Sequence, residues 1–125
     1  INDTIDILDG QIVNFSIEYK VLGSLDYNQS EVLEQCNSAL KSFYESQLLF
    51  GTPFYISEIY KILNDLDLVV DTQDVQIKQK FGSNYSGYAF DIEGATTDDG
   101  RFIIVPENVV LELKIPDENI IGVVV

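Results

Sequence analysis

Residues 28–70 decide the fold, and they read NQSEVLEQCNSALKSFYESQLLFGTPFYISEIYKILNDLDLVV. The segment predicts two amphipathic helices, roughly Ser30–Leu49 and Glu58–Leu66, because apolar residues recur at three- and four-residue intervals. The joint between them is expected at Phe50-Gly51-Thr52-Pro53, since glycine ends a helix readily and proline prevents its continuation. The rest of the chain is expected to pack around this pair.

The helix ends and buried faces follow from the same segment. Asn28 with Glu31 three residues later is typical of a capping box, and Ser57 is the expected N-cap of the second helix. The predicted buried side of the first helix consists of Leu33, Cys36, Leu40, Phe43 and Gln47/Leu48. That of the second consists of Ile59, Ile62, Leu63 and Leu66.

Strand patterns flank the helices. Gln11–Leu22 is the clearest predicted strand: apolar and polar residues alternate from Val13 to Val21, which predicts one buried and one solvent-facing side. Its apolar positions are Val13, Phe15, Ile17, Tyr19 and Val21. Leu68–Phe81 is the next predicted strand, and its lysines Lys78 and Lys80 favour an exposed or edge position.

The last third of the chain predicts further strands. Tyr88–Thr96 and Arg101–Val105 are expected to form a hairpin around Asp98-Asp99-Gly100, followed by a half-buried strand from Val109 to Ile115. The order strand, helix, helix, strand and then a meander predicts an α+β fold. In this fold, a mostly antiparallel sheet carries both helices on one face.

The chain predicts a single domain over residues 11–125, preceded at residues 1–10 by either a short first strand or a linker. The sequence begins at Ile1 and contains no methionine. We therefore expect this domain to be the C-terminal module of a longer protein.

Composition excludes several classes of function. The formal net charge is −14. Nucleic-acid binding requires a basic surface, which so acidic a chain does not offer, and binding to anionic membranes is disfavoured for the same reason. No apolar run approaches a membrane span in length. An acidic surface that binds a basic partner by charge remains one of the open hypotheses.

The residue types in this chain give little indication of a catalytic site. The chain has no histidine, which removes the commonest general base and metal ligand. Cys36 lies on the apolar stripe of a helix and is predicted to be a small buried hydrophobe. The sequence therefore predicts no catalytic residue, no cofactor-binding residue and no metal ligand.

Two polar clusters and one glycine-rich segment have ordinary structural explanations. Asn64, Asp65 and Asp67 are expected at a helix end, and Asp98-Asp99 in a turn, because neither cluster has the spacing of a calcium loop. Residues 82–87 contain two glycines but lack the lysine and the following helix of a phosphate-binding loop. A carboxylate-based metal-binding or enzymatic domain is kept as the alternative hypothesis.

The C-terminal run Ile120–Val125 is apolar and β-prone around a single glycine. Two interpretations stay open. It is either the last strand that completes the sheet, or a strand buried against another subunit.

Four stretches together resemble a known family. Residues 49–60 are similar to the helix-turn-helix of baseplate-J-like proteins, and residues 68–72, 98–108 and 115–122 follow in the order found there. Over roughly residues 11–125 the chain resembles the C-terminal region of the baseplate wedge subunit of contractile-tailed bacteriophages. The Gly-Val that usually follows the second helix is replaced by Leu68-Val69-Val70.

The resemblance implies a structural virion protein rather than an enzyme. Wedge subunits of this family pair with themselves, contact other wedge proteins and form a ring around the tail hub that rearranges when the sheath contracts. The location implied is the tail baseplate, with assembly in the host cytoplasm. We expect self-association, as a dimer, through Ile120–Val125 and the exposed side of the first helix.

Overall fold

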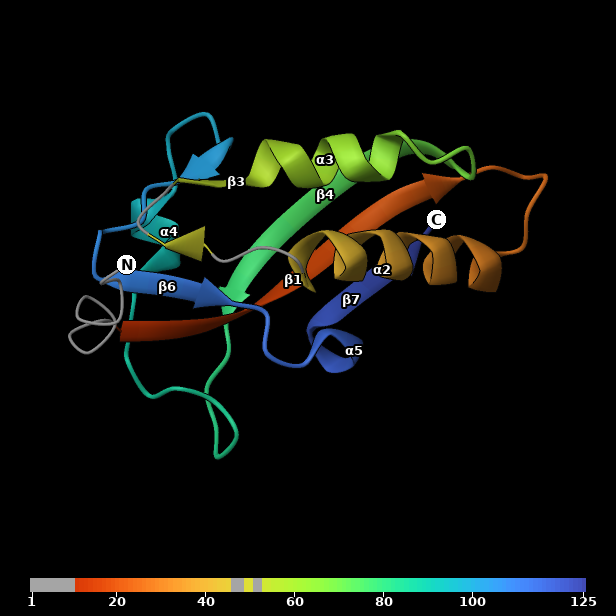
Figure 1. Ribbon diagram of the computed structural model, residues 1–125. Helices are drawn as coiled ribbons and strands as arrows, with labels where there is room; N and C mark the ends of the chain where they lie inside the picture. Colours follow the sequence, from red (N-terminus) through yellow and green to blue (C-terminus); the bar gives the residue numbers. More distant parts are fainter. Residues whose placement is uncertain (1–10, 46–48, 51–52) are drawn as a thin grey trace.

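The computed structural model of the protein describes residues 11–45, 49–50 and 53–125 (Figure 1). In chain order its elements are β1 (Gln11–Gly23), α2 (Gln29–Glu45), β2 (Leu49–Phe50), β3 (Phe54–Tyr55), α3 (Ile56–Asn64), β4 (Val69–Gln79), α4 (Ile92–Ala95), β5 (Phe102–Ile103), β6 (Val109–Glu112), α5 (Pro116–Asn119) and β7 (Ile120–Val124). The predicted α+β class is confirmed. The predictions for residues 1–10, Gln47, Leu48 and Gly51 lie outside the described residues.

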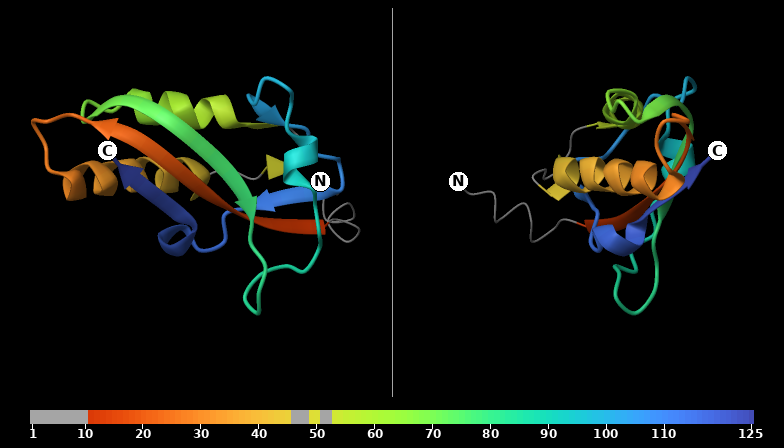
Figure 2. Two further views of the ribbon diagram at one scale, coloured as in Figure 1. Left: turned by 180° about the vertical axis from the view of Figure 1, so that it is seen from behind. Right: turned by 90° about the vertical axis from the view of Figure 1, so that its right-hand side faces the viewer.

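Strand β1 is the centre of the main sheet. Along one edge it pairs antiparallel with β4, and β6 and then β7 follow one another along its other edge (Figures 1 and 2). Antiparallel pairing also joins β2 to β6 and β3 to β5, so antiparallel pairs predominate as predicted. The last two strands, however, run parallel to β1 instead of forming a meander. The short detour through α5 lets the chain continue in one direction along that edge.

The period-two pattern of β1 places one row of side chains in the core, as predicted. Val13, Phe15, Ile17, Tyr19 and Val21 are all buried. Both long helices lie on this face of the sheet, with α2 over β7 and α3 over β4 (Figures 1 and 2). The expectation that the two helices pack on one face is confirmed.

Helix α2 begins as expected and ends earlier. The backbone N–H of Glu31 donates to Oδ1 of Asn28 over 2.8 Å, which confirms the N-terminal cap. The helix ends at Glu45 rather than at Leu49, because Leu49–Phe50 pairs with β6 instead. Its buried residues are Val32, Cys36, Leu40 and Tyr44, whereas the predicted Leu33 and Phe43 are half-buried.

Helix α3 starts at Ile56, two residues before the predicted start, and Ser57 is not its N-cap. The N-cap position is Tyr55, whose side chain makes no capping hydrogen bond. The Ser57 N–H instead donates to the carbonyl of Arg101 over 3.0 Å, so the pairing of β3 with β5 holds this helix start. Ile59 and Leu63 are buried, and Ile62 and Leu66 are half-buried.

The predicted strand Tyr88–Thr96 is wrong. Its second half forms the short helix α4, capped by Asp91, whose Oδ1 accepts the Gly94 N–H over 3.0 Å. The turn at Asp98-Asp99-Gly100 is confirmed: Gly100 has a φ of 71°, and its N–H donates to the Thr97 carbonyl. Only β5 and a single bridge between Thr96 and Ile103 remain of the hairpin.

Two other strands are shorter in the structure than the sequence predicted. The strand predicted over Leu68–Phe81 is β4, Val69–Gln79, and the strand predicted over Val109–Ile115 shortens to β6. Pro116 then occupies the start of α5, where a proline fits because its position needs no backbone N–H.

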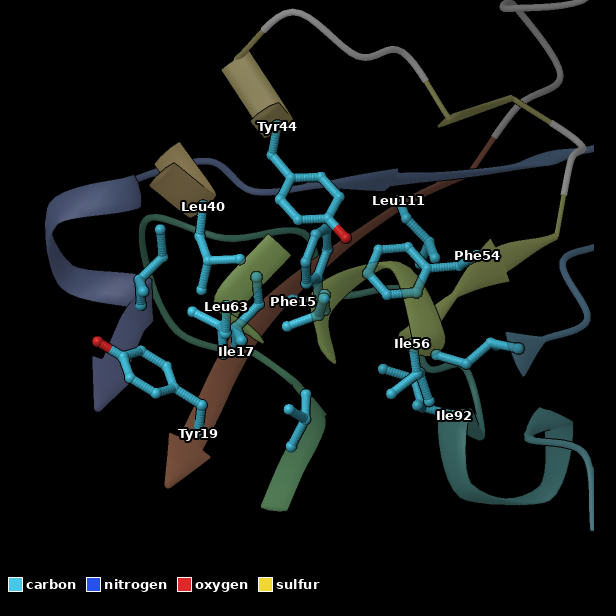
Figure 3. Close-up of a cluster of buried hydrophobic side chains, with 14 of the residues drawn as sticks. Phe15, Ile17, Tyr19, Leu40, Tyr44, Phe54, Ile56, Leu63, Ile92 and Leu111 are labelled. Atoms are coloured by element: carbon cyan, nitrogen blue, oxygen red, sulfur yellow. The ribbon is translucent and has the colours of Figure 1, made fainter. Parts of the chain in front are cut away.

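Three aromatic rings lie at the centre of the core (Figure 3). The ring centroid of Phe15 lies 5.1 Å from that of Phe54 and 5.9 Å from that of Tyr44, both edge-on. Tyr44 and Phe54 stack nearly parallel at 5.6 Å. The rings come from β1, α2 and β3, so this cluster ties the sheet to a helix and to the second, two-stranded sheet.

The opposite face of β1 is partly covered by the segment between β4 and α4. Asn14 is buried there; its Oδ1 accepts the Ser86 N–H over 2.6 Å, and its Nδ2 donates to Oε1 of Glu112 over 2.7 Å. Lys80 N–H also donates to the Asn14 carbonyl. A single buried amide thus connects β1, β6 and the covering segment.

Replacing Asn14 with alanine is expected to lower the free energy of unfolding by about 2 kcal/mol, because the partly buried Ser86 N–H loses its acceptor. Urea denaturation measures the loss. The matched control is Asn84→Ala, which removes an exposed amide side chain from the same segment. Equal effects of the two substitutions would contradict the role given to Asn14.

Candidate interaction surface

Strand β7 has two different faces because its side chains alternate. Ile120 is buried towards α2 and Val124 packs against the core. Ile121, Val123 and Val125 point away from the helices and are 47%, 53% and 44% exposed. The interpretation of Ile120–Val125 as a strand that completes the sheet therefore holds for one face, while the other face remains uncovered by the described residues.

Leu22 of β1 extends this apolar surface. The Val125 N–H donates to the Val21 carbonyl and its carbonyl accepts the Gly23 N–H, which places Leu22 beside Val125. We call Ile121, Val123, Val125 and Leu22 the β7 stripe. The sequence indicated Ile120–Val125 as an apolar run without distinguishing its two faces, and it gave no sign of Leu22, whose neighbour in space lies about a hundred residues away in the chain.

Charged residues border the β7 stripe. Glu18 of β1 is in register with Ile121, and Lys20 with Val123. Glu18 Oε1 also lies 3.2 Å from Nζ of Lys78 in β4. Because both partners of this ion pair are well exposed, it contributes little to stability. The result is an apolar strip with a polar border, which is the usual composition of a protein–protein contact.

Gly122 lets β7 lie directly against the side chain of Tyr19. A Cβ added there would lie 2.1 Å from Cζ of Tyr19, so the Tyr19 ring occupies the space of the missing side chain. The Tyr19 hydroxyl donates to Oδ1 of Asn37 in α2 over 2.5 Å. The face of β7 that carries the stripe is therefore fixed in place by a contact on its opposite face.

The exposed side of α2, the second predicted contact surface, has a different character. Its exposed residues are Gln29, Ser30, Glu31, Glu34, Gln35, Ser38, Ser42 and Glu45. They are polar or acidic and include no large apolar side chain. Of the two predicted surfaces, only the β7 stripe therefore offers apolar area to a partner.

The positions considered for chemistry have structural roles. Burial raises the pKa of the Cys36 thiol to about 11, so the thiol stays protonated and is a weak nucleophile. Asn64 Oδ1 accepts the Thr72 hydroxyl at 2.7 Å. Within the described part of the chain, no group of three or more His, Cys, Asp or Glu residues is placed to hold a metal ion.

The turn aspartate Asp99 is held by its own turn. Its Oδ1 accepts hydrogen bonds from the Thr97 hydroxyl and the Arg101 N–H. The Thr97 bond is the larger cause, and the Arg101 N–H adds to it, in lowering the pKa of this carboxyl. In the glycine-rich segment, Gly82 has a φ of 133° and its carbonyl accepts the Tyr85 N–H, which makes this segment a turn.

A surface hollow of about 650 Å³ lies beside α4. Its lining mixes Phe81 and Phe90 with Lys78, Asp91 and Glu93. Because both signs of charge are interspersed with apolar area, the hollow indicates no particular ligand. Among the described residues, no helix is long and apolar enough to cross a membrane.

Comparison with protein-family models, curated proteins and solved structures finds no match to this chain. The resemblance to baseplate wedge subunits therefore stays a prediction from the motifs. One detail of it can be placed in the structure: where Leu68-Val69-Val70 replaces the family's Gly-Val, β4 begins at Val69.

Proposed function

We propose that this domain is a structural assembly module of a phage tail baseplate wedge and that it has no catalytic role. Two lines of argument support the proposal: the order of the family motifs along the chain, and the exposed β7 stripe. The stripe carries the argument, because a continuous row of apolar side chains bordered by charges is a surface suited to a second protein. Self-association as a dimer and contacts with other wedge proteins are the expected interactions.

The proposed role is mechanical. Each copy contributes its β7 stripe to a contact within the ring around the tail hub. The ring rearranges on sheath contraction because packed interfaces switch between discrete arrangements rather than deforming continuously. The stripe is suited to such a contact since the Tyr19 ring lies against Gly122 on the other face of β7 and its hydroxyl bonds to Asn37 of α2.

The test is a lysine placed within the stripe. Val123→Lys is expected to raise the dissociation constant of the dimer by about tenfold or more, because it puts a charge into an apolar contact. Analytical ultracentrifugation measures the change. Ile104→Lys is the matched control: Ile104 is 60% exposed directly after β5 in the second sheet, and the substitution changes the net charge equally. Identical dissociation constants for the two variants would overturn the proposal.

A further inference from the structure

The outer edge of β7 presents unpaired backbone groups. Both backbone groups of Val125 bond to β1, its N–H to Val21 and its carbonyl to Gly23. Since successive residues of a strand direct these groups to opposite edges, those of Gly122 and Val124 point away from β1. None of the strands that the structure describes pairs with β7 on that side. The Ile120 N–H is already used by the Pro116 carbonyl.

Strands β4 and β7, which lie on either side of β1, differ in their protection against further pairing. Strand β4 has irregular register opposite Lys20/Val21 and Leu22/Gly23, and it carries Lys78. Lysines and bulges are the features that keep an edge strand from pairing with another chain. Strand β7 pairs in unbroken register and contains no charge and no proline. Its edge is therefore open to strand addition.

The position of α2 decides what can occupy this edge. An added strand would lie about 4.8 Å from β7, whereas two packed helices need about 8–10 Å between their axes. Antiparallel pairing of β7 with the β7 of a second copy would place both α2 helices on the same face. Because α2 lies over β7 (Figures 1 and 2), the two helices would collide. An extended segment that carries no covering helix fits.

The charge around the edge selects the chemistry of that segment. Asp117 and Glu118 are exposed immediately before β7. On the side of α2 nearest β7, Lys41 lies 3.2 Å from Asp117, and Glu34, two turns earlier, shares that side. The border of the edge is therefore net acidic, as is the chain, which has 21 acidic and 7 basic residues.

We propose that the free edge of β7 binds an extended, basic segment of another protein by strand addition. Backbone hydrogen bonds to Gly122 and Val124 hold the segment. Its outward side chains continue the β7 stripe, and its lysines or arginines face Glu34, Asp117 and Glu118. This contact uses the edge of β7, whereas the proposed self-association uses its outward face, so the two can be tested separately.

The probe is a fluorescently labelled peptide of alternating lysine and valine, followed by anisotropy. We expect it to bind the wild-type domain, and a glutamate–valine peptide of the same length to bind at least about tenfold more weakly. Raising the salt concentration is expected to weaken binding. Absence of binding at millimolar peptide, or equal affinity for the two peptides, would overturn the proposal.

A proline and amide exchange locate the binding site. Val124→Pro removes an N–H that points away from β1, so it is expected to weaken binding at least about tenfold while β7 stays paired with β1. Independently of that variant's folding, the peptide is expected to slow amide exchange at Gly122 and Val124 of the wild-type domain and to leave Val123 unchanged. Protection at other strands alone would contradict the edge as the site.

Discussion

Phe15→Ala is expected to lower the free energy of unfolding by about 4 kcal/mol, the largest loss from any single truncation discussed here. Phe15 is fully buried, and its ring contacts those of Tyr44 and Phe54 edge-on (Figure 3). Removing the ring takes away its transfer free energy and leaves a cavity between a strand, a helix and the second sheet. A domain of ordinary stability would lose a large part of its free energy of unfolding.

Urea denaturation of the wild type and the variant measures this loss. The control is Phe81→Ala, since Phe81 is 56% exposed in the segment after β4, and its truncation is expected to change stability by about 0.5 kcal/mol or less. If Phe15→Ala cost less than about 1.5 kcal/mol, the three rings could not form the centre of the core.

Gly122→Ala is expected to cost about 3 kcal/mol, an unusually large effect for one added methyl group. The Cβ would lie 2.1 Å from Tyr19 Cζ, so the ring must leave its place. That ring is buried and held by its hydrogen bond to Asn37. Burial also raises the pKa of the Tyr19 phenol, which therefore stays neutral and cannot escape by ionising.

A double-mutant cycle attributes the cost to this contact. In a Tyr19→Ala background, where the ring is absent, Gly122→Ala is expected to cost at most about 0.5 kcal/mol, which gives a coupling energy of about 2.5 kcal/mol. Gly87→Ala is a control, because a Cβ at Gly87 would meet no atom within 4 Å. An equal cost of Gly122→Ala in both backgrounds would show that Tyr19 does not cover Gly122.

Elements governed by local pattern were predictable. The alternation in β1, the Asn28 cap of α2 and the turn at Gly100 each depend on residues close together in the sequence, and the structure confirms all three. The interpretation of Cys36 as a small buried hydrophobe is likewise confirmed.

Elements decided by distant contacts were not predictable. The apolar pattern of α2 continues past Glu45, but Leu49–Phe50 pairs with β6, some sixty residues later in the chain. The region Tyr88–Thr96 has the composition of a strand, yet the Asp91 cap of Gly94 closes a helical turn within it. The parallel pairing of β6 and β7 with β1 has no sequence signal of its own, since no tight turn specifies it.

The candidate surface was likewise predictable only where it depends on local sequence. The apolar, β-prone run Ile120–Val125 is visible in the sequence, but nothing in it separates the exposed side chains from the buried ones. The contribution of Leu22, and the contact between Tyr19 and Gly122 that holds β7, join residues about a hundred positions apart. Only the folded arrangement brings them together.

Sedimentation equilibrium of the wild-type domain, from micromolar to millimolar concentration, tests the central claim most directly. If the β7 stripe is a contact between copies, the apparent mass should rise reversibly with concentration from that of one chain towards that of two. A mass of one chain at every concentration would contradict the claim.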